Sequence, residues 1–141
     1  MSFSFKQTVL IVGLGLAFAV SAAGAANAQE RVPLPNQVYV FEDVDYSGAS
    51  AQWNIGQSVP DLRRWNTPAG KSWNDRISSI RVGANARMLG YENINFGGKC
   101  IIFAGTSAGG RGDYNNLTYN MGDNWNDRIS SLKVVNASTR C

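Results

Sequence analysis

The stretch of sequence that decides the fold is Trp73-Asn74-Asp75-Arg76-Ile77-Ser78-Ser79-Ile80. It returns 52 residues later as Trp125-Asn126-Asp127-Arg128-Ile129-Ser130-Ser131-Leu132, and seven of the eight residues are identical. A repeat of this length and identity indicates a duplicated structural unit. From the last residue of each copy onward, apolar residues alternate with polar ones, as Ile80 and Val82 and as Leu132 and Val134, which is typical of a strand with one buried face.

A second pattern lies upstream of each copy and also occurs twice. An aromatic residue is followed by a second aromatic five positions later and by glycine two positions after that, as Phe41, Tyr46, Gly48 and as Tyr91, Phe96, Gly98. The offset of 50 residues is close to that of the octapeptide, so one unit measures about 45–50 residues. The glycine supplies the positive φ that a tight turn requires.

The apolar residues inside each unit follow the period of strands. We expect strands over 37–41, 51–55 and 99–103, and two more around Ile80–Val82 and Leu132–Val134. Shorter strands are expected to begin near Ser58 and near Arg111. No window of ten residues after residue 28 has a helical apolar period. Short strands separated by Gly, Asn and Pro predict an all-β, two-sheet sandwich.

The first 28 residues have the layout of a secretory signal peptide. Lys6 precedes an apolar run over 9–23, and Ala26-Asn27-Ala28 is a small-residue cleavage signature before Gln29. The run is short for a membrane span, and an uncleaved anchor is the alternative. We therefore expect a secreted or periplasmic protein whose mature chain, 29–141, is a single domain without a membrane segment.

Charge and composition exclude several classes of function. Twelve Lys and Arg face ten Asp and Glu after residue 28, and the basic residues are scattered, so we expect no nucleic-acid partner. The chain has no histidine, which removes the commonest general base and imidazole metal ligands. An enzyme is therefore not expected, and any metal should be a hard cation bound by oxygen.

The two cysteines, Cys100 and Cys141, predict one disulfide in an exported protein. It would tie the C-terminus to the second repeat. Two free thiols, or a bond between two chains, are the alternatives.

The two hairpins and the two copies of Asn-Asp-Arg-Ile-Ser-Ser resemble the βγ-crystallins, whose Ca²⁺ signature is (N/D)(N/D)-x-x-(S/T)-S. The resemblance covers about residues 36–135, and it departs from the family in Phe41, where tyrosine is usual, and in two extra residues in the second unit. It implies a Greek-key β-sandwich made of a first motif, about 36–83, and a second motif, about 86–135.

The resemblance also implies two Ca²⁺ ions bound between the motifs. Each signature packs an amide, a carboxylate and hydroxyls, which are the oxygen ligands that Ca²⁺ takes. In the family each ion takes a carboxylate from one loop and a hydroxyl plus a backbone carbonyl from the other. A further carbonyl comes from the residue after the first hairpin aromatic. Carried onto this chain, the side-chain ligands are Asp75, Asp127, Ser78 and Ser130, and the main-chain ligands are Arg76, Arg128, Glu42 and Glu92. Asn74 and Asn126 belong to the same sites.

Two alternatives remain open at this point. Asn, Asp and Ser before a strand are also common turn residues, so the signatures could be turns without a metal. Some small secreted proteins that look similar act as protease inhibitors or toxins, and the glycine-rich loop at 105–113 is the candidate for such an activity. A protein partner is therefore possible.

Overall fold

The two motifs exchange one strand each, and this exchange builds both sheets. The structure is a computed structural model that describes residues 31–141; the predicted signal peptide, 1–28, lies outside the described residues. The strands are β1 (Gln37–Asp43), β2 (Ser47–Asn54), β3 (Ser58–Val59), β4 (Ser79–Val82), β5 (Ala86–Asn93), β6 (Gly97–Ala104), β7 (Asp113–Tyr114) and β8 (Ser131–Asn136). The described residues contain no α-helix, only the 3-10 turns η2 (Val44–Tyr46), η3 (Leu62–Arg64) and η4 (Ile94–Phe96).

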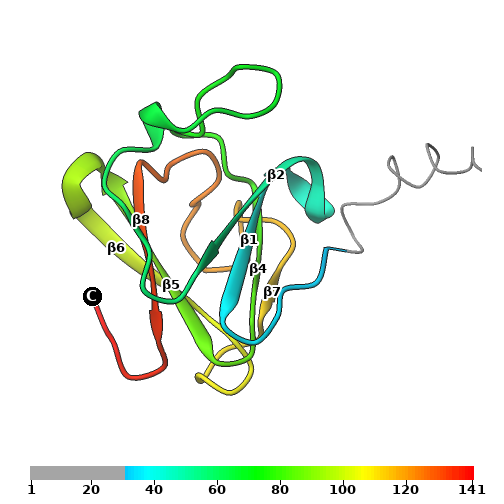
Figure 1. Ribbon diagram of the computed structural model, residues 1–141, viewed down its shortest axis with the longest axis vertical. Helices are drawn as coiled ribbons and strands as arrows, with labels where there is room; N and C mark the ends of the chain where they lie inside the picture. The colour runs from blue at the N-terminus through cyan, green and yellow to red at the C-terminus, as the bar shows by residue number, and fades with distance from the viewer. Residues whose placement is uncertain (1–30) are drawn as a thin grey trace, which may run out of the picture.

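One sheet has the order β2-β1-β4-β7 and the other β3-β8-β5-β6, and every pairing is antiparallel (Figure 1). The short strand β3 of the first motif pairs with β8 of the second, with Ser58 opposite Lys133. In return, β7 pairs with β4, with Tyr114 opposite Ile80. The predicted two-sheet Greek-key sandwich is confirmed, including the two short strands, whereas their exchange between the sheets was not predicted.

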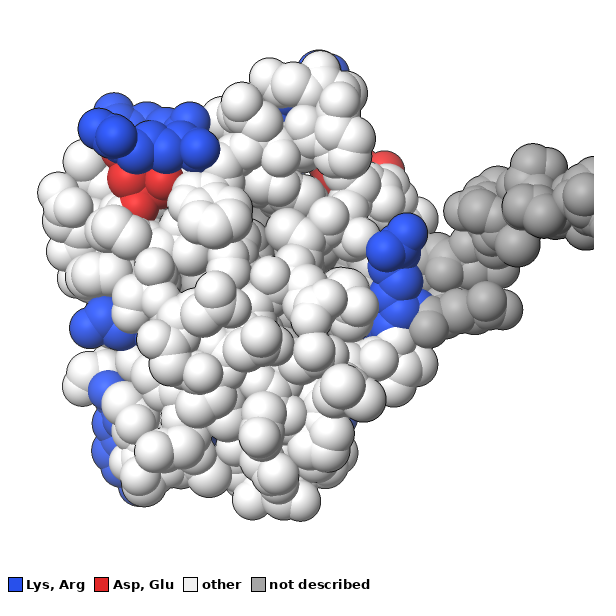
Figure 2. Space-filling view, in the orientation of Figure 1, with Lys and Arg blue, Asp and Glu red and all other residues white. Residues whose placement is uncertain are grey.

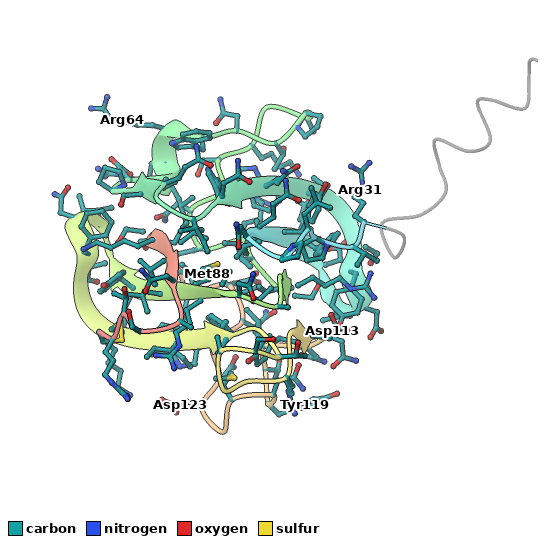
Figure 3. All side chains as sticks on the ribbon, turned by 60° about the horizontal axis from the view of Figure 1, so that its bottom comes forward. Arg31, Arg64, Met88, Asp113, Tyr119 and Asp123 are labelled. Carbon is teal, nitrogen blue, oxygen red and sulfur yellow. A yellow bond between two sulfur atoms is a disulfide. The ribbon has the colours of Figure 1, made fainter. Side chains whose placement is uncertain are left out.

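The core lies between the two sheets, and alternation along the strands places residues in it. Val38 and Val40 of β1 are buried on one side, and Met88 of β5 is buried on the other. Met88 sits in the middle of the molecule in Figure 3, between the two layers. Trp73 and Trp125, which precede the signatures, are both buried in this cluster. Their equivalent packing follows from their equivalent positions in the two motifs.

Each hairpin is folded over by a 3-10 turn, which brings its second aromatic ring onto the first. Tyr46 meets Phe41 with ring centroids 5.7 Å apart, and Phe96 meets Tyr91 at 5.5 Å, both edge to face. Gly48 and Gly98 have positive φ, as expected. The residues before them do so as well: Asp45, Tyr46, Asn95 and Phe96 have φ between 56° and 60°. The sequence pattern predicted a simpler turn there.

The C-terminus is bonded to β6, the edge strand of the second sheet. Cys100 and Cys141 form a disulfide with their Cα atoms 6.1 Å apart, which confirms the predicted pairing. The residues after β8 turn back beside this sheet (Figure 1). Arg87 of β5 also holds this segment, because its Nη1 donates to the Thr139 carbonyl at 3.0 Å.

The glycine-rich loop at 105–113 packs onto the body of the domain instead of projecting from it. Arg87 donates to the Ala108 carbonyl at 2.9 Å, and Ala108 is buried. Gly105 lies so close to Gly83 that a Cβ on it would overlap the Gly83 carbonyl. The loop with more exposed residues is that at 63–71, which contains Arg64 and the half-exposed Trp65. Figure 3 shows Arg64 at the periphery of the molecule.

Basic side chains form separate groups on the face shown in Figure 2, and one of these groups lies directly over acidic side chains. Arg63 and Arg64 are paired in this way with Asp61. Among residues 31–141, no helix is long and apolar enough to span a membrane.

We predict that reduction of the Cys100–Cys141 bond lowers the Tm without unfolding the protein at 25 °C. The bond closes a loop across 41 residues, and on the chain-entropy account it contributes about 4 kcal/mol. For a domain of this size that corresponds to a fall in Tm of about 15 °C or more. Thermal melting with and without a dithiol reductant tests this. The Cys100→Ser/Cys141→Ser variant is the control and should not respond to the reductant. An equal Tm for oxidised and reduced protein would contradict the prediction.

Candidate metal centre

The two signature loops, 74–79 and 126–131, contact each other directly across the domain. The N–H of Asp75 donates to the Ile129 carbonyl at 3.0 Å, and the N–H of Asp127 donates to the Ile77 carbonyl at 3.1 Å. The two hydrogen bonds join corresponding residues of the two motifs. Ile77 and Ile129 are fully buried in the common core, so the loops are anchored by apolar packing beneath them.

The carboxylate of each loop lies beside a hydroxyl of the other loop. Ser78 Oγ donates to Asp127 Oδ1 at 3.2 Å, and Ser130 Oγ donates to Asp75 Oδ1 at 3.1 Å. Asp75 and Asp127 have φ of 53° and 54°, a left-handed conformation that aspartate adopts more readily than most residues. Each oxygen pair therefore joins the two motifs, which is the crossed arrangement that the resemblance implies.

The hairpins complete two equivalent clusters. The N–H of Ser78 donates to the Phe41 carbonyl at 2.9 Å, which holds the next residue, Glu42, beside the signature. Glu42 Oε2 lies 3.2 Å from Nη1 of Arg76. In the second motif Ser130 bonds Tyr91 in the same way, and Glu92 pairs with Arg128. We define the first site as Glu42, Arg76, Ser78 and Asp127, and the second site as Glu92, Arg128, Ser130 and Asp75.

Both signatures also contain a buried amide oxygen without a hydrogen-bond partner. Oδ1 of Asn74 and Oδ1 of Asn126 are each inaccessible to solvent and accept no hydrogen bond from the described residues. Buried acceptors are rarely left unpaired, and a bound ion is one reason for an exception. The available donors are carboxylate, hydroxyl, amide and carbonyl oxygens, which fit Ca²⁺. The described residues contain no cluster of three or more His, Cys, Asp or Glu, the usual arrangement of a transition-metal site.

The last serine of each signature has a different role, which sequence reasoning missed. Ser79 Oγ accepts from the N–H of Tyr46 at 3.0 Å and donates to the Asp43 carbonyl at 2.6 Å. Ser131 bonds Phe96 and Asn93 with the same distances. Ser79 and Ser131 are fully buried, and these hydrogen bonds fasten the folded hairpins to the sheets. The sequence does contain an indication of this role: each signature that ends in two serines follows one copy of the aromatic-x4-aromatic-x-Gly hairpin.

The charges at the rim of the sites are paired. The hydrogen bond from Arg128 lowers the pKa of Glu92 below its usual value. Lys99 lowers the pKa of Asp123 in the same way. Figure 3 shows Asp123 at the periphery of the molecule. Asp43 and Asp45 are exposed, and Asp45 accepts a hydrogen bond from Asn115 at 3.0 Å.

Comparisons with known proteins find a matching family model and similar solved structures. A family model described as Beta/Gamma crystallin matches residues 34–109, which is more than half of the chain. A βγ-crystallin domain from Flavobacterium johnsoniae is 28% identical, with a TM-score of 0.54, over 73% of this chain and 98% of that one. A domain from Clostridium beijerinckii is 26% identical, with a TM-score of 0.52, over 70% and 95%. No curated protein matches the chain.

A more distant structure has the same fold. It is the βγ-crystallin domain of Abundant Perithecial Protein from Neurospora crassa in its Ca²⁺-bound form, 19% identical, with a TM-score of 0.55, over 77% of this chain and 97% of that one. At this identity the likeness concerns the fold.

We predict that the two neighbouring serines of one signature differ in their effect on the metal-free protein. Ser79→Ala removes the partner of the buried Tyr46 N–H and of the part-buried Asp43 carbonyl, which costs about 2–3 kcal/mol of unfolding free energy. Ser78→Ala removes one bond to an exposed carboxylate and should cost less than about 1 kcal/mol. Urea unfolding in chelator measures both. Ser131→Ala and Ser130→Ala provide the matched pair in the second motif. Equal losses for Ser78→Ala and Ser79→Ala would show that the hairpin bonds are not the stronger restraint.

Proposed function

The chain belongs to the beta/gamma crystallin family, and from this premise we propose that it is an exported, non-enzymatic protein that binds two Ca²⁺ ions. The observation that carries the proposal is the crossed pairing of each aspartate with a serine of the other loop, at 3.2 Å for Ser78–Asp127 and 3.1 Å for Ser130–Asp75. A turn without a function needs neither this pairing nor the unpaired buried oxygens of Asn74 and Asn126.

The donor set favours Ca²⁺ over other common cations. Ca²⁺ accepts six to eight oxygen ligands in irregular geometry, whereas Mg²⁺ demands a near-ideal octahedron and gives up water reluctantly. Zn²⁺ prefers nitrogen and sulfur, and here both cysteines are in the disulfide. Each site offers one aspartate and otherwise neutral oxygens from Ser, Asn, Glu main chain and Arg main chain. One formal charge places the affinity on the order of 10⁻⁵ to 10⁻³ M, as in extracellular modules.

The proposed role of the metal is to join the two motifs. A bound ion would supply positive charge at the point where oxygens of both loops gather. In the first site Asp127 would reach across from the second motif, and Ser78 would bind from the first. In the second site Asp75 would reach across from the first motif, and Ser130 would bind from the second. The existing contacts hold these residues near their binding positions, so little ordering should be required when the metal binds.

Export is the remaining part of the proposal. A disulfide persists in oxidising compartments, and the pair Cys100–Cys141 is consistent with a secreted or periplasmic protein. The signal-peptide prediction for residues 1–28 points the same way. The alternative of a secreted inhibitor or toxin-like protein has less support, because its candidate loop at 105–113 packs against Arg87 and Gly83.

We predict that saturating Ca²⁺ raises the Tm by about ten degrees or more. Each filled site stabilises the folded state by about 2.7 kcal/mol at one hundred times Kd. Calorimetric titration measures the Kd and the stoichiometry of two, and thermal melting in chelator and in Ca²⁺ at about one hundred times that Kd measures the shift. Mg²⁺ at the same concentration is the control and should give a much smaller shift. Absence of both heat and a Tm shift in Ca²⁺ would overturn the proposed function.

We predict that the two sites can be removed one at a time across the motif boundary. Asp75→Ala should reduce the stoichiometry from two to one, because Asp75 is the proposed carboxylate ligand of the second site, where Glu92 would bind by its main-chain carbonyl. Asp75→Ala/Ser130→Ala should still bind one ion, since both residues serve the same site. Asp75→Ala/Ser78→Ala should bind none. If Asp75→Ala/Ser78→Ala bound one ion and Asp75→Ala/Ser130→Ala bound none, the crossed assignment would be wrong.

A further inference from the structure

An arginine stands in the middle of each signature and makes the same two contacts in both motifs. Arg76 Nε donates to the Ser72 carbonyl at 2.9 Å, and its Nη1 donates to Glu42 Oε2 at 3.2 Å. Arg128 donates in the same way to the Asn124 carbonyl and to Glu92. Each guanidinium therefore bridges the start of its own loop and the end of the hairpin strand.

The two segments joined by each arginine both belong to one site. Under the proposed function, on which this inference rests, the main-chain carbonyls of Glu42 and Arg76 are ligands of the same ion. Their side chains are bonded to each other, so the bridge fixes the separation of the two peptide groups. The hydrogen bond from Ser78 N to the Phe41 carbonyl fixes the adjoining peptide. The carbonyl of Ser72 holds the arginine from the other side.

The bridge depends on the shape of arginine. The guanidinium is a planar fork that can donate in two directions at once, whereas the lysine ammonium is a compact charge on a flexible stem. Arg76 and Glu42 are about one-third and one-quarter exposed, so solvent does not fully separate them. Arg128 is further restrained because its guanidinium carbon lies 4.9 Å from the centre of the buried Trp125 ring.

We propose that Arg76 and Arg128 are positioning residues for Ca²⁺, each of which holds two main-chain carbonyls of one site at the spacing that the ion requires. The paired glutamate neutralises the arginine, so that a cation close to the site does not repel Ca²⁺. Each arginine–glutamate pair thus makes its site more rigid, and because the two charges cancel, the pair does not change the net charge of the site.

Charge and positioning predict opposite results for one substitution. Arg76→Ala removes a positive charge and leaves Glu42 unpaired, so electrostatics alone predicts tighter Ca²⁺ binding at the first site. If the arginine positions the carbonyls, the same change weakens binding. Arg76→Lys keeps the charge and loses the fork, so electrostatics predicts no change and positioning predicts a loss. Glu42→Gln leaves Arg76 unneutralised and weakens binding on either account.

The experiment measures Ca²⁺ affinity at the first site alone, by calorimetry in the full oxidised chain carrying Asp75→Ala. We expect Arg76→Ala and Arg76→Lys each to weaken binding about tenfold, as is typical when a residue that orients metal ligands is lost. Arg64→Ala is the matched control, because Arg64 is an exposed arginine paired only loosely with Asp61, at 3.8 Å. It should leave the affinity unchanged. Circular dichroism of each variant in chelator shows whether it is folded.

A second readout separates positioning from general destabilisation. Tb³⁺ replaces Ca²⁺ in oxygen sites, and its luminescence lifetime in H₂O and D₂O counts the water molecules bound to the ion. A carbonyl that is no longer held in place should be replaced by water, so Arg76→Ala should add bound water at saturation whereas Arg64→Ala should not.

The outcomes distinguish the two proposals. If the Asp75→Ala parent binds no Ca²⁺, the proposed function fails and the positioning role fails with it. If the parent binds and Arg76→Ala binds equally or more tightly, with unchanged hydration, the positioning role is overturned while the Ca²⁺ site stands.

Discussion

The contact on which the rest of the structure depends is the crossing of the two signature loops. Asp75 and Asp127 each bond the opposite loop through the main chain and through the side chain. This crossing is possible because β3 and β7 leave their own motifs and pair with the opposite sheet. Neither motif could form a complete sheet or a complete oxygen cluster alone. The duplication thus joins the two motifs through shared sheets, with the two oxygen clusters at their junction.

Two consecutive serines in each signature divide the structural and the chemical tasks. The first, Ser78 or Ser130, presents its hydroxyl to a carboxylate of the other loop. The second, Ser79 or Ser131, is fully buried and holds the folded hairpin through two hydrogen bonds. Ser79 and Ser131 are the first residues of β4 and β8, whereas Ser78 and Ser130 still belong to the loops before them, so adjacent serines serve two different environments. The short motif therefore links the crossed Ser–Asp contact between the loops to the geometry of the hairpin.

The two motifs are equivalent at the loops and unequal at the C-terminus. The C-terminal segment is attached to the second sheet. Cys100 on β6 forms the disulfide with Cys141, and Arg87 on β5 donates a hydrogen bond to the Thr139 carbonyl. Arg87 also holds the loop at 105–113, which contains the two extra residues of the second motif. These additions lie away from the crossed loops and leave the symmetric pairs of Ser78–Asp127 and Ser130–Asp75 undisturbed. Stabilisation by the disulfide and by the crossed loops therefore acts on different parts of the domain.

The sequence by itself determined the duplication, the strand pattern and the disulfide. Alternation and glycine positions are local properties, so they could be interpreted without coordinates, and two cysteines allow only one intramolecular pair. The exchange of β3 and β7, the folded hairpins with Tyr46 and Phe96 at positive φ, and the roles of Ser79, Arg76 and Arg87 were decided by the tertiary structure. Each of these depends on contacts between residues 21 to 75 positions apart. No local pattern specifies such contacts, because the same residues in a lone motif would have nothing to pair with.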